Sequence, residues 1–210
     1  MRFMFWKAGY TKLTILDLGS KFDTSNVTDM NSMFNQTGFS AMTKLELRDK
    51  FDTSNVIDMN SMFNQTGFSA MTELELGEKF NTTKVMDMTY MFYATGHNQL
   101  KILNLRAKFN TSKVLLMTGM FENMQALEQL IVGKEFDTGR VLNMKEMFQD
   151  TGKTSMISLD LGDKFYTTSV TNMSNMFKGT GSTAMTSLDL GPAFTKIAST
   201  NTGMFSNTGK

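Results

Sequence analysis

Apolar residues recur along the chain with a period of about 29 residues, which lies within the range of roughly 20–50 residues that marks repeat architectures. A phenylalanine marks each period, and only the step between the fourth and fifth members is shorter: Phe22, Phe51, Phe80, Phe109, Phe136, Phe165 and Phe194. Methionine follows the same period in two columns, and each member of the second column is followed by phenylalanine, as in Met33-Phe34. The pattern therefore predicts a solenoid in which equivalent side chains of successive coils lie on top of each other.

Within one repeat, the apolar spacing changes from alternation to steps of three and four. The triplet 45–47, Leu-Glu-Leu, is too short for a helical stripe and predicts a strand with two inward leucines and an outward central residue. Asp23 and its neighbours Thr24 and Ser25 offer helix N-cap side chains. The next apolar residues lie at i, i+3, i+6 and i+7: Val27, Met30, Met33 and Phe34. This spacing favours a short helix or 3₁₀ turn.

The predicted fold class is an α/β solenoid, a leucine-rich-repeat-like right-handed coil with one short strand and one short helix or 3₁₀ turn in each repeat. The alternative is an all-β parallel β-helix. We expect one repeat domain over 1–210 with about seven units after a partial repeat 1–15: 16–44, 45–73, 74–102, 103–129, 130–158, 159–187 and 188–210. Because the chain begins and stops inside a repeat, without polar capping units, we expect a piece of a longer protein or ends covered by partners, including end-to-end self-association.

Composition narrows the classes of function. The net charge is +1, from 21 basic and 20 acidic residues, which gives no basic face for nucleic acid. No run of about 18 apolar residues occurs, so we expect no membrane insertion. Residues 1–12 lack the apolar core of a signal peptide. The chain has no cysteine, which excludes disulfides, zinc–thiolate sites and thiol nucleophiles.

The repeated motif carries a family resemblance. LDLGSKFDTSNVTDMNSMF, which begins at Leu16, resembles the unit LDLxxFDTSNVTxMxxMF of the BspA-like leucine-rich-repeat surface proteins of bacteria. The motif recurs about seven times and covers nearly the whole chain. The resemblance implies an extracellular or cell-surface protein, secreted or wall-anchored, that adheres to host proteins or to neighbouring cells.

The outward residues of the strand ladder form the candidate binding face. The central strand column is acidic at both ends, where like charges about 5 Å apart repel, but it is not acidic in the middle. We expect a partner-binding patch there, flanked by carboxylates: Ile102, Asn104, Arg106, Gln129 and Ile131, with Glu46 and Glu75. A shortened loop at 124–126 breaks the uniform array beside this patch. Neutral drift on a solvated sheet is the alternative interpretation.

Other periodic columns suggest structural roles. The 21 methionines indicate core packing, because leucine replaces methionine within one column, which does not suit metal ligation. Aspartates at 23, 29, 52, 58 and 87 raise the question of calcium, but no EF-hand loop is present and asparagine or tyrosine replaces some of them, which suits turns. A threonine column raises ice binding, but lysine or arginine stands two residues on in the middle repeats. Lysines before the phenylalanines, with Asp49, Glu78 and Asp163 beside them, suggest an exposed charge stripe.

The sequence contains no catalytic motif. His97 lies in a turn where other repeats carry Phe39 and Phe68, so a surface role is expected rather than general-base chemistry. No GxSxG, HExxH, Walker or GxGxxG motif occurs. We therefore expect no enzyme, no cofactor and no metal, and a binding domain for an unidentified host extracellular or neighbouring-cell protein. A structural stalk is the alternative function, and a carbohydrate-binding face would need an aromatic row that the strand columns lack.

Overall fold

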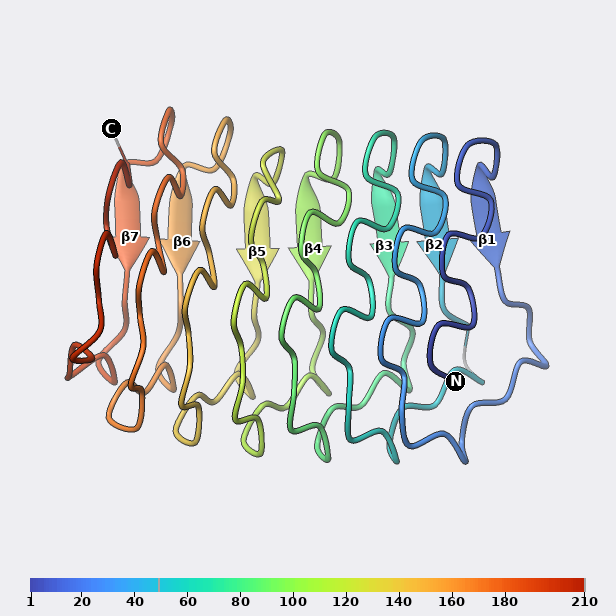
Figure 1. The fold of residues 1–210 in the computed structure, drawn as a ribbon, viewed down its shortest axis with the longest axis horizontal. Coiled ribbons are helices and arrows are strands. Elements are labelled where there is room, and N and C mark those ends of the chain that lie inside the picture. The colour runs from blue at the N-terminus through green and yellow to red at the C-terminus, as the bar shows by residue number, and fades with distance from the viewer. Residues whose placement is uncertain (49, 210) are drawn as a thin grey trace.

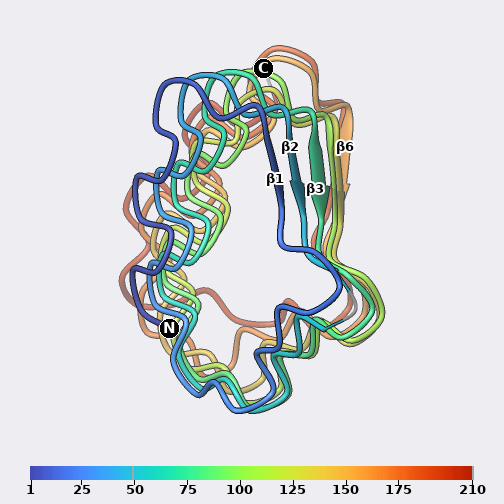
Figure 2. The same ribbon diagram turned by 90° about the vertical axis from the view of Figure 1, so that its right-hand side faces the viewer.

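In the computed structural model, which describes residues 1–48 and 50–209, the chain winds into a solenoid of stacked coils (Figure 1). One side of the solenoid carries seven three-residue strands: β1 (Ile15–Asp17), β2 (Lys44–Glu46), β3 (Glu73–Glu75), β4 (Ile102–Asn104), β5 (Gln129–Ile131), β6 (Ser158–Asp160) and β7 (Ser187–Asp189). The strands recur with the period of the phenylalanines, and the one shorter step lies between β4 and β5. Viewed along the axis, the coils superimpose, with the strands forming one wall (Figure 2).

The strand wall forms because its leucines alternate with polar residues. In β2, Leu45 is fully buried between the half-buried Lys44 and Glu46, and the following Leu47 is buried as well. The predicted inward leucines and outward central residue are thereby confirmed. Neighbouring strands are parallel and in register, so that Leu45 pairs with the equivalent leucines of β1 and β3. The ladder joins β1-β2-β3, β4-β5 and β6-β7, and within the described residues no ladder joins β3 to β4 or β5 to β6.

The segment expected to be helical is a run of β-turns, and the described residues contain no helix. The amides of Met33, Asn35 and Thr37 donate to the carbonyls three residues before them, at 2.9–3.2 Å. The intervening amides donate instead to carbonyls of the following coil, at 2.8–2.9 Å: Ser32, Phe34 and Gln36. An α-helix requires consecutive amides to bond four residues back, whereas here every second amide bonds between coils. The α/β expectation is therefore wrong, and the alternative all-β parallel solenoid describes the fold.

Two files of phenylalanine and the methionine columns fill the interior. Eight rings stack along one file with centroids 5.3–5.8 Å apart: Phe5, Phe34, Phe63, Phe92, Phe121, Phe148, Phe177 and Phe205. In the other file, Phe22 stacks on Phe51 at 6.5 Å. Met30 and Met59 are fully buried, as are most of their column, which confirms their packing role. Each coil therefore buries the faces of its neighbours.

Buried threonines tie the coils together through their hydroxyls. The Oγ1 of Thr24 donates to the carbonyl of Asp52 in the next coil at 2.8 Å. In a second column, the Oγ1 of Thr66 donates to the carbonyl of Phe34 in the preceding coil at 2.6 Å. Both side chains are fully buried. The threonine column that raised ice binding thus faces the interior, where it satisfies backbone carbonyls.

Candidate functional site

The structure brings four of the predicted site residues together on the outer side of β4 and β5. In the parallel register, Ile102 pairs with Gln129, and Asn104 pairs with Ile131. Ile102 is 54% exposed, while Ile131 is half-buried. These two cross-strand pairs form an uncharged patch on the outside of the strand wall, in its middle. The residues between them in each strand, Leu103 and Leu130, are buried in the core.

Arginine bridges neutralise the acidic columns beside this patch. Glu46 and Glu75 are direct partners in the ladder. Arg48 lies 2.7 Å from Glu46 and 2.7 Å from Asp17. Arg106 forms ion pairs with Glu75 and Glu78 across the interruption between β3 and β4. The repulsion expected at the β1–β3 end of the central column is therefore offset by side chains from neighbouring columns.

These contacts shift the pKa values of the charged groups that they join. Hydrogen bonds from the Arg48 side chain and then from the Gly19 amide lower the pKa of Asp17 to about 2. The hydrogen bond to Glu73, 2.7 Å away, raises the pKa of Lys44. The sequence prediction included Arg106 but missed Arg48 and Lys44. The signal that could have identified them is a basic residue one or two positions from an acidic column.

The aspartate and asparagine residues of the central column have a local structural role. Their Oδ1 atoms accept the amide two residues further on, at 2.8–2.9 Å: Asp17, Asn104, Asp160 and Asp189. At these four positions the Asx turn ends the strand and leads into a residue with positive φ. That residue is glycine at Gly162 and Gly191, but it is Arg106 in the turn after β4, with a φ of 61°. The identity of Asn104 therefore follows from the turn, whereas that of Ile102 does not.

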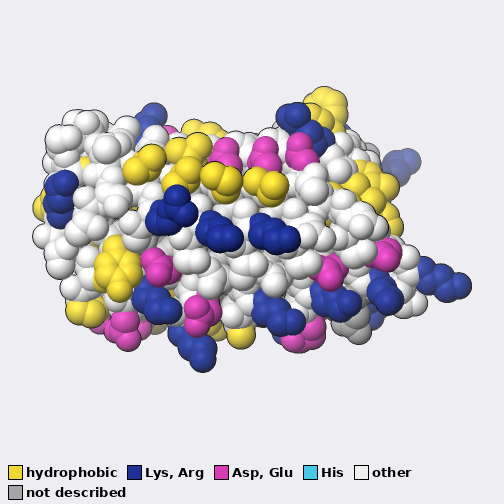
Figure 3. All heavy atoms as spheres, turned by 90° about the horizontal axis from the view of Figure 1, so that it is seen from below, with side chains coloured by type: hydrophobic (Ala, Val, Ile, Leu, Met, Phe, Trp, Pro, Cys, Tyr) yellow, Lys and Arg dark blue, Asp and Glu magenta, His cyan; other side chains and the backbone are white. Residues whose placement is uncertain are grey.

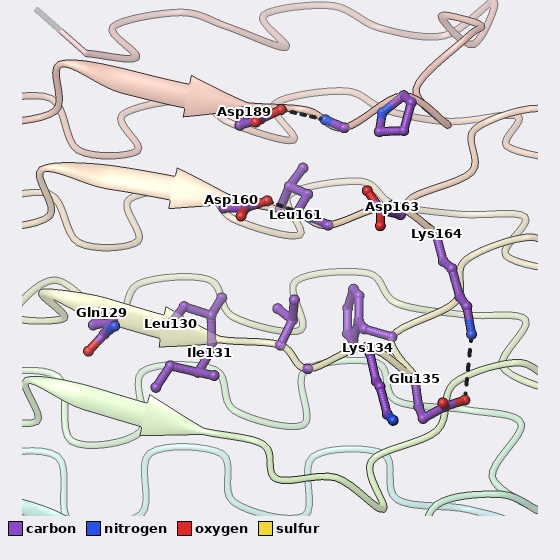
Figure 4. A pocket seen from close by; sticks show the side chains of 16 residues that line it. Gln129, Leu130, Ile131, Lys134, Glu135, Asp160, Leu161, Asp163, Lys164 and Asp189 are labelled. Carbon is purple, nitrogen blue, oxygen red and sulfur yellow. Dashed lines mark hydrogen bonds and ion pairs between the residues drawn. The ribbon is translucent and has the colours of Figure 1, made fainter.

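Two hollows flank the β4–β5 patch. One of about 670 Å³ lies over β5, β6 and β7, where Gln129 and Ile131 line it together with Asp160 and Asp189 (Figure 4). Its lower rim carries the ion pair of Glu135 and Lys164, 3.6 Å apart. The other hollow, of about 230 Å³, is lined by Ile102, Asn104, Arg106 and Glu75. The predicted residues thus lie on two adjoining concave surfaces at the interruptions of the ladder, and Glu46 lies in a third hollow with Arg48.

The other aspartate columns also form turns. The Oδ1 atoms of Asp29, Asp58 and Asp87 accept the amides two residues on at 2.8–2.9 Å. Those of Asp23 and Asp52 do the same at 2.9 Å. Over residues 1–48 and 50–209, no group of three or more histidine, cysteine, aspartate or glutamate side chains is placed to hold a metal ion.

No helix of the described chain is long and apolar enough to cross a membrane.

The expected charge stripe is only partly formed. Asp49 lies outside the described residues. Glu78 pairs with Arg106 rather than with a lysine of the stripe. Lys164 pairs with Glu135 of the preceding coil instead of with its neighbour Asp163. These pairs are exposed and contribute little to stability individually.

An aromatic file at the loop edge was missed by the sequence analysis. Tyr10, Phe39, Phe68 and His97 stack with centroids 4.8, 4.8 and 4.4 Å apart. His97 ends the file, and its Nδ1 lies 2.6 Å from the carbonyl oxygen of Asn123. Because each inner ring is covered on both faces by its neighbours, the file presents ring edges rather than a stacking platform for sugars. The shared repeat position of Phe39 and Phe68 was the available signal.

A titratable cluster lies on the turn side of the solenoid. Tyr90, Tyr93, Glu122 and Glu146 line a hollow of about 290 Å³. Burial, followed by the nearby charges of Glu146 and Asp150, raises the pKa of Glu122 to about 7. The Nε2 of Gln149 donates to Glu122 at 3.3 Å. We therefore expect this cluster to make the stability of the solenoid depend on pH between about 4.5 and 7.

Comparison with known proteins identifies a family. No curated protein and no solved structure matches the chain. One family model matches it in two stretches, residues 1–107 and 96–210, which together cover the whole chain. The chain belongs to the family described as Mycoplasma protein of unknown function, DUF285.

Proposed function

We propose that the chain is a non-enzymatic binding module of a bacterial cell surface, which adheres to a host extracellular or neighbouring-cell protein through its strand wall. The observation that carries this proposal is the exposed Ile102 in an uncharged patch between two hollows. The surface localisation rests on the resemblance of the repeated motif to BspA-like leucine-rich-repeat proteins. A repeat fold is a scaffold that does not itself determine function, so we look for the function in a surface site such as this patch.

The surroundings of the patch suit a protein partner. An apolar side chain in a concave surface with polar groups around it is the usual composition of an interface centre. Gln129 and Asn104 supply amides for hydrogen bonds, and Arg106 and Glu75 supply a charged rim. Asn104 and Ile131 interrupt the central strand column, which is acidic in all the other strands. Ile15 in β1 is similarly exposed, at 56%, but its central-column neighbour is the acidic Asp17, whereas Ile102 lies beside the uncharged Asn104 and Ile131.

The test is binding to an array of immobilised extracellular-matrix and cell-surface proteins. We expect at least one saturable partner, whose binding is lost in Ile102→Lys. Ile157→Lys is the matched control, because Ile157 is 63% exposed and lies outside both hollows. Retained binding by Ile102→Lys, or equal loss in both variants, would contradict a strand-wall site.

A structural stalk is the second candidate. The continuous file of eight stacked rings favours it, because such a core transmits rigidity along the axis. A stalk predicts that the isolated solenoid binds nothing on the same array. The array experiment therefore separates the two functions.

A further inference from the structure

A second face of the solenoid carries an exposed apolar row. Ile57, Met86, Leu115 and Leu142 occupy equivalent positions in four successive coils, and the amide of each later member donates to the carbonyl of the one before it at 2.9 Å. Ile57, Met86 and Leu142 are 47%, 44% and 44% exposed. Figure 3 shows this row as a yellow band across the face. Leu116, 38% exposed, adds to it.

A row of cations runs beside the apolar row. Lys84, Lys113 and Arg140 each stand two residues before an apolar member, and the valine between them is fully buried, as at Val85. This alternation places cation and apolar side chain together on the outside of each coil. Within the described residues none of the three cations forms an ion pair, and Lys84 donates only to the Oδ1 of Asn55, at 2.7 Å. Figure 3 shows the cations as a dark blue row alongside the apolar one.

The two rows stop at defined coils. The equivalent positions are Asn26 and Thr28 in the first coil, and Ser169 and Thr171 in the sixth. A column of aspartates, Asp29, Asp58 and Asp87, directly follows the apolar positions in the chain. It also changes in the middle coils, because Leu116 occupies the position that follows Asp87 in this column. The fold therefore accepts small polar residues at these sites. Exposed leucine and unpaired cations in the middle coils are thus not required by the stacking.

We propose that this face binds an acidic amphipathic helix of another protein. Ile57, Met86 and the three cations line a shallow hollow of about 270 Å³, which gives a discrete seat for side chains. Carboxylates on one flank of the helix would meet the cation row, while its apolar stripe covers the apolar row. A flat lipid surface would not fill a hollow.

The spacing of the coils selects a helix over a strand. Successive coils are about 4.8 Å apart, and a helix turn rises about 5.4 Å, so that side chains of successive turns stay near successive coils. Same-face side chains of a strand recur at about 6.8 Å and lose this match within two coils. Three coil steps span about 14 Å, the length of about ten helical residues. The described part of this chain contains no helix, so none of its own described segments can take this seat.

This inference is independent of the strand wall. The face shares no residue with the β4–β5 patch, and its binding is measured with different variants. One variant, Lys84→Asn/Lys113→Asn/Arg140→Ser, introduces residue types that this column has in other coils, at Asn55 and Ser169. A second, Met86→Thr/Leu115→Thr/Leu142→Thr, introduces the threonine of Thr28 and Thr171. A control, Lys21→Asn/Lys108→Asn/Lys134→Asn, removes the same charge elsewhere.

The experiment selects peptides of about 15 residues from a displayed random library on the wild-type chain, with counter-selection on the cation variant. We expect enriched peptides with aspartate or glutamate on one flank and leucine or isoleucine at i, i+3 and i+4, which gain helical circular dichroism on binding. Both face variants should weaken the Kd of a synthetic enriched peptide at least about tenfold, and the control should not. Circular dichroism of each variant verifies folding.

Three results would overturn the proposal: no enrichment, enriched peptides without acidic residues, or a Kd unchanged in both face variants. Vesicles containing about 30% phosphatidylserine are tested in parallel. Vesicle binding that the face variants abolish, without any peptide binding, would show a membrane surface instead and would equally overturn the helix proposal.

Discussion

The phenyl ring of Phe63 lies over that of Phe34 in the preceding coil, with centroids 5.5 Å apart and planes within 1° of parallel. The same relationship continues through eight coils. Equivalent residues of successive coils therefore contact each other directly. This is why one repeat is not an independent folding unit and why the core extends along the axis.

Removing a ring from the middle of the file should destabilise the whole solenoid. Phe92 is fully buried between Phe63 and Phe121 at 5.4 and 5.8 Å. We expect Phe92→Ala to lower the free energy of unfolding by about 3–5 kcal/mol, because it leaves a cavity that its neighbours cannot fill. Urea denaturation measures the change. The control Phe3→Ala, at a ring 50% exposed, should cost far less, and equal losses would argue against a stacked interior.

Two glycines with positive φ should respond differently to alanine. Gly67 has a φ of 54°, and a Cβ there would lie 2.5 Å from the Cβ of Met71. Gly162 has a φ of 72°, with nothing within 4 Å of the added atom. Both variants incur a backbone cost of about 1–2 kcal/mol, and Gly67→Ala adds an overpacking cost of about 1–3 kcal/mol. Thermal unfolding should rank Gly67→Ala as clearly less stable, and the reverse order would contradict the turn packing.

Stability should decline as the pH rises through the titration of Glu122. Burial raises its pKa from 4.5 to about 7, so the folded state keeps a proton that the unfolded state releases near pH 4.5. Between these values the folded state binds more protons, and its stability falls with increasing pH. We expect Glu122→Gln to remove this decline, with little difference from wild type at pH 4 and greater stability at pH 8. Parallel urea-midpoint curves for the two proteins would count against the buried carboxyl.

The sequence predicted the period, the inward leucines and the stacked columns, because burial fixes which positions are apolar. It did not predict the backbone of the segment from Met30 to Thr37. Inward residues three apart suit a helical turn and successive β-turns equally well. The deciding feature is a positive φ at Ser32 and Gln36, and neither residue type signals such a conformation. Bonding between coils, which requires the stacked neighbour, makes that conformation favourable.

The candidate site was also predictable in part, namely in which residues face outward. The outward columns of the strand wall placed Ile102 and Ile131 on the surface side, as the structure shows. The interruptions of the ladder depend on distances between coils, and the ion pairs of Arg48 depend on side-chain conformation, so neither follows from residue spacing. The apolar row through Met86 was visible as a period of two around Val85, but it lies outside the strand columns.

The most direct test of the stacked-coil account is excimer fluorescence between paired pyrene labels, which the absence of native cysteine makes specific. Ile57→Cys/Met86→Cys places the labels one coil apart in the same exposed column, and Ile57→Cys/Thr72→Cys places them closer in sequence but on different faces. The account predicts strong excimer emission from the first pair and monomer emission from the second. Excimer emission from the second pair alone would contradict it.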